Sequence, residues 1–155
     1  MPRRIVLHLL TLVVALSSAL AQSAAPAKPP IGIPADAQWF NGKWYRVYIE
    51  PGGWKSGKEK CERLRGQLAV VKDAPTDAFI RELAGDKTLW LGAYEKVPGL
   101  WLWMDGTEMK FKAWAPGQPD PHTKPQWLHT WKGGWGDANE DDKIVIGYIC
   151  EWKAR

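Results

Sequence analysis

The pattern of hydrophobic and polar positions in the first half of the chain predicts one strand and two amphipathic helices. Lys43–Ile49 is rich in aromatic and β-branched residues and ends at a Pro-Gly-Gly turn, as a strand does. From Trp54 to Arg65, apolar residues recur at helical spacing among charged ones, and a glycine follows. A short apolar run, Leu68–Val71, separates this helix from a second one predicted over Thr76–Ala84.

The second half of the chain has a strand-like pattern, in which short apolar runs are separated by Gly, Pro and Asp turns. These runs are Leu89–Ala93, Leu100–Met104, Trp127–Trp131 and Gly147–Trp152. Two early helices followed by several short strands predict an α+β domain with antiparallel pairing. No internal repeat is visible.

The N-terminal residues 1–21 predict a secretory signal peptide. A positively charged start precedes the apolar run Ile5–Leu16, and Ala19-Leu20-Ala21 supplies small residues for cleavage before Gln22. The alternative is an uncleaved anchor, but the run is shorter than the roughly 20 residues that span a bilayer. No other segment is long enough to span, so the mature protein is expected to be exported, that is, secreted, periplasmic or extracellular.

Residues 22–38 are rich in Ala and Pro and have no periodic apolar face, so they predict a tether before a domain over residues 39–155. The full chain has 21 basic and 17 acidic residues. Loss of Arg3 and Arg4 with the signal leaves 19 basic residues and a net charge of about +2. Because the basic residues are also scattered, nucleic acid is not an expected partner.

Two cysteines, Cys61 and Cys150, stand near the two ends of the predicted domain. In an exported protein such a pair most simply forms one disulfide, and two free thiols are the alternative. After the signal peptide the only serines are Ser23 and Ser56, and the two cysteines are expected to be bonded to each other. The chain therefore has few side chains that could act as a catalytic nucleophile. A glycan hydrolase using paired carboxylates remains a minor hypothesis, and the chain is expected not to be an enzyme.

Several short motifs, in order across residues 39–153, together resemble the C-type lectin-like domain family. They are Trp54…Cys61, Gly66-Gln67-Leu68-Ala69, Phe79, Trp90-Leu91-Gly92-Ala93, Trp101-Leu102-Trp103-Met104-Asp105-Gly106, Trp114…Gly117-Gln118-Pro119-Asp120, Trp135-Gly136-Asp137 and Tyr148-Ile149-Cys150-Glu151. The resemblance implies a C-type lectin-like fold with a long-loop region, in which Cys61 and Cys150 form the long disulfide. The second, short disulfide of the family is missing.

The resemblance also implies a ligand site in the long-loop region. In lectin members a calcium ion there binds sugar hydroxyls, and Gln118, Asp120 and Asp137 match three of its side-chain ligands. Pro119 is expected in the cis form, which would aim its two neighbours to the same side. The Gln-Pro-Asp order resembles galactose-type rather than mannose-type selectivity, conditional on bound calcium.

Two positions depart from the family pattern and leave the calcium set incomplete. Lys124-Pro125-Gln126 stands where a glutamate is expected, and Gly136 replaces an asparagine. Calcium favours about 6–8 oxygen ligands, so the alternative is that Gln118-Pro119-Asp120 is a turn whose side chains cap local backbone. His122 and His129 lack a third ligand at zinc-like spacing, which argues against zinc.

Trp127 and Trp135 flank the loop and are candidates to stack on a sugar ring, although a buried strand explains them equally well. The leading hypothesis is therefore an exported module that binds carbohydrate or a glycoconjugate. The alternative is a calcium-independent domain of the same fold that binds a surface protein.

Overall fold

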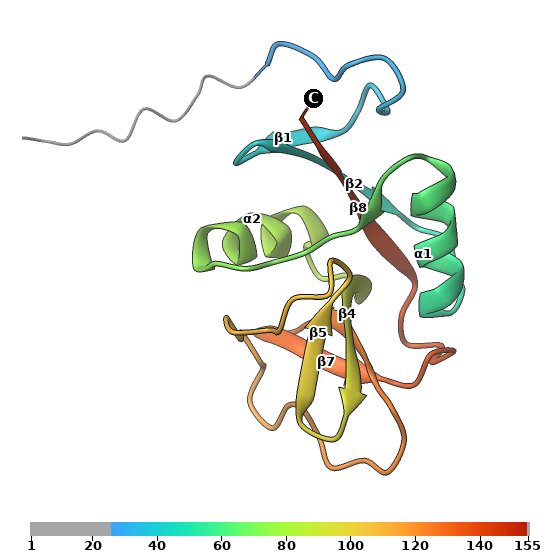
Figure 1. Ribbon diagram of the computed structural model, residues 1–155, viewed down its shortest axis with the longest axis vertical. Helices are drawn as coiled ribbons and strands as arrows, with labels where there is room; N and C mark the ends of the chain where they lie inside the picture. The colour runs from blue at the N-terminus through green and yellow to red at the C-terminus, as the bar shows by residue number, and fades with distance from the viewer. Residues whose placement is uncertain (1–25, 155) are drawn as a thin grey trace, which may run out of the picture.

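The computed structural model describes residues 26–154, so the predicted signal peptide, residues 1–21, lies outside the described part of the chain. Eight strands and two helices form in this part (Figure 1). In chain order they are β1 (Gln38–Phe40), β2 (Lys43–Tyr48), α1 (Trp54–Arg63), β3 (Gln67–Leu68), α2 (Ala74–Ala84), β4 (Leu89–Val97), β5 (Leu100–Trp103), β6 (Trp127–Trp131), β7 (Gly134–Ala138) and β8 (Gly147–Lys153).

The strands form one mixed sheet in the order β1-β2-β8-β4-β6-β7, with β3 paired to β8 and β5 paired to β4. The pairs are antiparallel except β4 with β8, which is parallel. The α+β class is confirmed, and the parallel pair adds to the antiparallel pairing that was expected. It arises because the C-terminal strand enters the sheet between β2 and β4.

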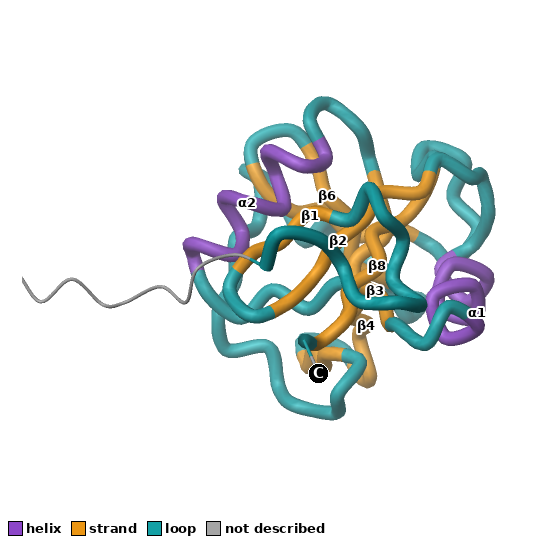
Figure 2. The backbone as a smooth tube through the Cα atoms, turned by 90° about the horizontal axis from the view of Figure 1, so that it is seen from above, coloured by secondary structure: helices purple, strands orange, loops and turns teal. Residues whose placement is uncertain are grey.

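The two helices lie on opposite sides of the strands when the molecule is seen from above (Figure 2). Helix α2 begins where the Asp73 side chain accepts a hydrogen bond from the Thr76 N–H at 2.8 Å, and a proline occupies its first turn. It ends at Gly85, whose φ of 58° is unfavourable for other residues.

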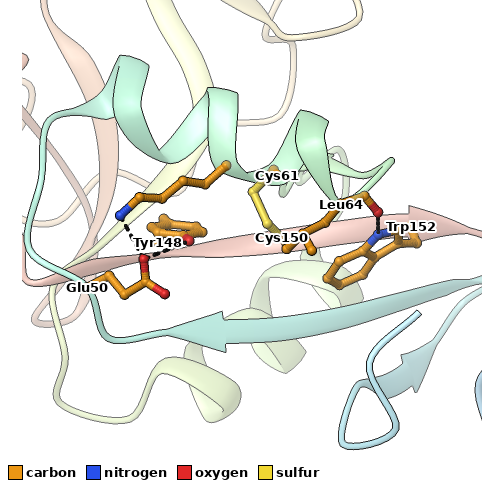
Figure 3. The surroundings of a disulfide bond; sticks show 7 residues. Glu50, Cys61, Leu64, Tyr148, Cys150 and Trp152 are labelled. Carbon is orange, nitrogen blue, oxygen red and sulfur yellow. Dashed lines mark hydrogen bonds and ion pairs between the residues drawn. A yellow bond between two sulfur atoms is a disulfide. The ribbon is translucent and has the colours of Figure 1, made fainter. Parts of the chain in front are cut away.

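Helix α1 is fastened to β8 by covalent and polar contacts (Figure 3). Cys61 and Cys150 form the expected disulfide, which joins residues 89 positions apart in the chain. The Trp152 indole N–H also donates to the Leu64 carbonyl at 2.9 Å. These contacts hold the end of the chain against its first helix, and the disulfide restricts the unfolded chain.

The domain begins earlier than the predicted boundary at residue 39. Strand β1 starts at Gln38, Ala37 is buried, and Ile33 packs against the core. The last residues of the predicted tether are therefore part of the packed domain. No helix among the described residues is long and apolar enough to cross a membrane.

One buried carboxylate joins three strands of the sheet. Glu151 on β8 is 1% exposed, and both of its oxygens lie 2.9 Å from the Lys43 ammonium on β2. It also accepts from the Gln67 amide on β3 at 2.7 Å and from the Val70 N–H at 3.0 Å. A buried charge with this many donors is fully compensated, so its loss leaves several donors unpaired.

We expect Glu151→Gln to lower the free energy of unfolding by about 2 kcal/mol, because the charged hydrogen bonds disappear while side-chain size is kept. Urea unfolding measures this change. Glu50→Gln is the matched control, because Glu50 pairs with Lys60 at the surface and such pairs contribute only about 0–1 kcal/mol. Equal losses in the two variants would contradict the assignment.

Candidate functional site

The loop between β5 and β6, residues 104–126, is called the long loop below, and it lies against the free edge of β7. The Trp135 N–H donates to the Ala113 carbonyl and the Ala115 N–H donates to the Trp135 carbonyl, both at 2.8 Å. A Cβ atom at Gly134 would collide with the Ala113 carbonyl oxygen, so glycine permits this close approach. The long loop thus satisfies the edge of the sheet.

Gln118 continues this pairing with its side chain. Its Oε1 accepts from the Asp137 N–H at 3.2 Å, the next outward-facing N–H along β7 after that of Trp135. The Gln118–Pro119 peptide bond is cis, as expected from the sequence. The Asp120 N–H then donates to Asp137 Oδ1 at 3.2 Å. The structure therefore brings together the three predicted ligands, Gln118, Asp120 and Asp137.

His122 lies within this group and was not among the predicted site residues. Its Nδ1 is 2.7 Å from the Asp120 carbonyl oxygen and 3.1 Å from Asp137 Oδ2. Its Nε2 is 2.7 Å from Glu95 Oε2, which belongs to β4. A neutral imidazole carries one N–H, whereas both nitrogens here face accepting oxygens. The geometry therefore suits the protonated ring.

The charges around His122 agree with this geometry. Burial alone would lower the pKa of His122, but its hydrogen bonds to Glu95 and to the Asp120 carbonyl outweigh burial and raise that pKa. The nearby carboxylates of Glu95 and Asp137 act in the same direction. An imidazolium is thus stabilised between acidic groups.

Asp137 has an unusual environment for a carboxylate. Its side chain is 0% exposed, and burial raises its pKa above the ordinary value. Oδ1 accepts from Asp120, but Oδ2 makes no hydrogen bond within residues 26–154, because the His122 Nδ1 hydrogen is directed at the Asp120 carbonyl. The His122 ring, whose Nδ1 lies 3.1 Å from Oδ2, gives this buried oxygen an ion pair but no hydrogen bond.

One atom from each of Asp120, His122 and Asp137 lies within 4.8 Å of the other two, which is a grouping that can hold a metal ion. The set does not fit calcium. Calcium takes about 6–8 oxygen ligands, whereas one member here is an imidazole and the Gln118 oxygen already accepts from Asp137.

The two departures from the family pattern have structural causes that remove further oxygens. At Gly136, an added Cβ would lie 2.7 Å from Cε1 of the buried His129 ring, so this position has no room for asparagine. Gln126 is buried, and its amide nitrogen donates to the Lys124 carbonyl at 3.1 Å. Neither position supplies a carboxylate to the site.

Neither predicted tryptophan joins the cluster. Trp135 is 0% exposed, and its indole N–H donates to Asp77 of α2 at 2.8 Å, so it offers no face to a ligand. Asp137 of β7 is paired with Leu128 of β6, so these two side chains lie on the same face of the β6–β7 ribbon. Because side chains alternate along a strand, Trp127, which precedes Leu128, lies on the opposite face. There Trp127 packs near Trp54 and is only partly exposed.

A small surface pocket of about 200 Å³ adjoins the cluster. It lies between the β4–β5 turn and the long loop, and its lining includes Glu95, Val97, His122 and Lys124. Sequence reasoning missed Glu95 because β4 is distant in the chain. For His122 a signal existed, since it stands two residues after a predicted ligand in Asp-Pro-His.

We expect Gly136→Asn, which restores the family's asparagine, to lower the free energy of unfolding by roughly 1–3 kcal/mol by overpacking against His129. Gly52→Asn is the control, because a Cβ there makes an ordinary 3.4 Å contact with the Ser56 side chain. Urea unfolding compares the two. A Gly136→Asn protein as stable as the parent would show that His129 can move aside.

We expect calcium at millimolar concentration to leave the melting temperature of chelator-treated protein unchanged, because the donors do not form a calcium cage. Differential scanning calorimetry measures this. A calcium-dependent increase that Asp137→Asn abolishes would show that the site rearranges around calcium.

Comparisons with known proteins agree with this architecture. Residues 50–152 match the family described as the Lectin C-type domain. C-type lectin lectoxin-Lio3 of Erythrolamprus poecilogyrus is 33% identical over 129 residues, covering 76% of this chain and 80% of that protein. The galactose-specific lectin nattectin of Thalassophryne nattereri is 35% identical over 75 residues, covering 44% of this chain and 47% of that protein.

Among solved structures, the mouse scavenger receptor C-type lectin carbohydrate-recognition domain superposes with a TM-score of 0.69 at 25% identity, covering 79% of this chain and 98% of that one. The family match spans most of the described domain, and the relatives share its fold. The chain therefore belongs to the C-type lectin domain family, whose members are binding modules and not enzymes.

Proposed function

We propose that this protein is an exported carbohydrate-binding module that contacts its sugar through the long loop. The predicted signal peptide, residues 1–21, supports export. The observation that carries the proposal is the gathering of planar polar side chains beside the pocket of about 200 Å³. Sugar-binding sites need such groups, because each sugar hydroxyl both donates and accepts a hydrogen bond.

The members of the cluster supply both kinds of partner. The exposed Asp120 carboxylate accepts, and the amide nitrogen of Gln118 donates while its oxygen is held by the Asp137 N–H. His122 is 18% exposed and reaches the pocket, so its ring also faces a bound ligand. Sugar contact through these residues is direct and does not depend on calcium.

Galactose-type selectivity is the finer part of the proposal. The order of amide and carboxylate in Gln118-Pro119-Asp120 implies it by resemblance, and nattectin carries the description galactose-specific. That inference was conditional on calcium, which the donor set does not fit. Galactose and mannose glycans should therefore be compared directly.

A calcium-independent protein-binding role is the second candidate, because two exposed isoleucines, Ile49 and Ile146, lie at one end of the sheet. Ile49, Ile144 and Ile146 are 51%, 46% and 37% exposed, and Ile49 and Ile146 adjoin the paired ends of β2 and β8. Exposed apolar side chains in one place are typical of protein interfaces.

We expect the protein to bind terminal-galactose glycans on an array equally in calcium and in chelator. Asp120→Asn should weaken this binding about tenfold or more by removing a charged acceptor. Asp141→Asn, an exposed carboxylate outside the cluster, is the matched control and should bind like the parent. No glycan binding in either condition would reject the sugar proposal, and preference for mannose would reject its galactose part.

A further inference from the structure

The chemistry of the cluster points to a different kind of metal from the one its location suggests. An imidazole nitrogen and two carboxylates are ligands that suit zinc, cobalt, nickel and copper, whereas calcium takes oxygens alone. Here the nitrogen is His122 Nδ1, and the carboxylates are those of Asp120 and Asp137. No zinc-like spacing is visible in the sequence, because Asp137 reaches the group from a strand that lies further along the chain.

A second observation points to a ligand independently of the clustering. Asp137 Oδ2 is buried, faces His122, and has no hydrogen-bond partner among the described residues. The two carboxylates carry two negative charges, which a divalent ion neutralises. Asp137 Oδ2 has an ion pair with the His122 ring at 3.1 Å but no hydrogen bond within residues 26–154, and a metal ion at this point would bind this buried oxygen directly.

Glu95 supplies the partner that the second ring nitrogen of His122 needs when the first one binds a metal. Its Oε2 lies 2.7 Å from His122 Nε2, and its Oε1 accepts from the Gly99 N–H at 2.7 Å, so the carboxylate itself is fixed. Histidine ligands of metals commonly donate their second ring N–H to a carboxylate, which sets the tautomer and directs the other nitrogen at the metal. Here Nδ1 donates to the Asp120 carbonyl at 2.7 Å and lies 3.1 Å from Asp137 Oδ2, so ligation exchanges that hydrogen bond for the metal while Glu95 keeps Nε2.

We propose that Asp120, His122 and Asp137 form a binding site for a zinc-class divalent ion, with Glu95 as the positioning residue. On binding, the ion takes the Nδ1 lone pair and the Nδ1 proton leaves to solvent. Three protein ligands leave a fourth position open to water or to a ligand hydroxyl, as in zinc sites that are not purely structural.

A modest rearrangement completes the site. Zinc–ligand distances of about 2.0–2.2 Å place tetrahedral ligand atoms about 3.3 Å apart. The three ligand atoms here lie within 4.8 Å of one another, so the set must contract. Asp120 is the exposed member and its carboxylate makes no hydrogen bond within residues 26–154, so it is free to close on the ion.

The test is calorimetric titration of metal-free protein with zinc chloride, and separately with calcium and magnesium chloride. We expect one equivalent of zinc to bind and the melting temperature to rise, with no response to calcium or magnesium. Cobalt(II) should give visible absorption bands of a nitrogen-containing, low-coordinate site. Absence of zinc binding, or a response to calcium alone, would overturn the proposal.

Variants distinguish zinc bound at the proposed site from zinc bound adventitiously elsewhere on the protein. His122→Gln and Asp120→Asn should each weaken zinc binding at least tenfold, and Glu95→Gln should weaken it about 10–100-fold with an altered cobalt spectrum. Asp141→Asn is the matched control and should bind zinc like the parent. Melting of each metal-free variant verifies that it is folded. Equal zinc affinity in His122→Gln and the parent would place the ion elsewhere.

The site lies in the loop used for the proposed function, yet the two fail separately. Glycan binding in chelator with no uptake of zinc would reject the metal site and leave the sugar proposal intact. Zinc uptake by a protein that binds no glycan would have the opposite meaning.

Discussion

The free edge of β7 is the constraint on which the candidate site depends. An unpaired strand edge exposes backbone donors and acceptors, and in this domain the long loop covers them. The backbone of residues 113–115 pairs with Trp135, and the Gln118 side chain replaces a backbone carbonyl opposite Asp137. These bonds fix the path of the long loop and thereby place Asp120 and His122 beside Asp137 of β7.

The same arrangement creates an electrostatic demand. Glu95 and Asp137 are almost completely buried, and both face His122. Buried carboxylates are costly unless a positive charge or several donors compensate them. The protonated ring of His122 partly compensates these two carboxylates, but Asp137 Oδ2 still lacks a hydrogen bond among the described residues. In this domain a histidine thus stands among acidic groups at a place where lectin members of the family hold calcium.

The remainder of the domain gives the loop a rigid base. The Trp135 ring packs edge-on against Trp103, and its indole N–H donates to Asp77 of α2, so the core side of β7 is held in place. At the other end of the molecule the disulfide and the Glu151 network tie α1, β2 and β3 to β8. An irregular segment can therefore hold a defined geometry without many hydrogen bonds of its own.

Sequence by itself determined the two helices, most of the strands and the disulfide, and it pointed to the long loop as the candidate site. Local periodicity and turn residues encode the helices and strands, and the order of the short motifs along the chain indicated the family. Strand β7 escaped because Gly134–Ala138 has two glycines and no alternating apolar pattern. Only the tertiary structure decided that Trp135 is buried, that Trp127 faces away, and that Glu95, His122 and Asp137 meet. Their meeting follows from pairing between distant strands, which leaves no periodic trace in the local sequence.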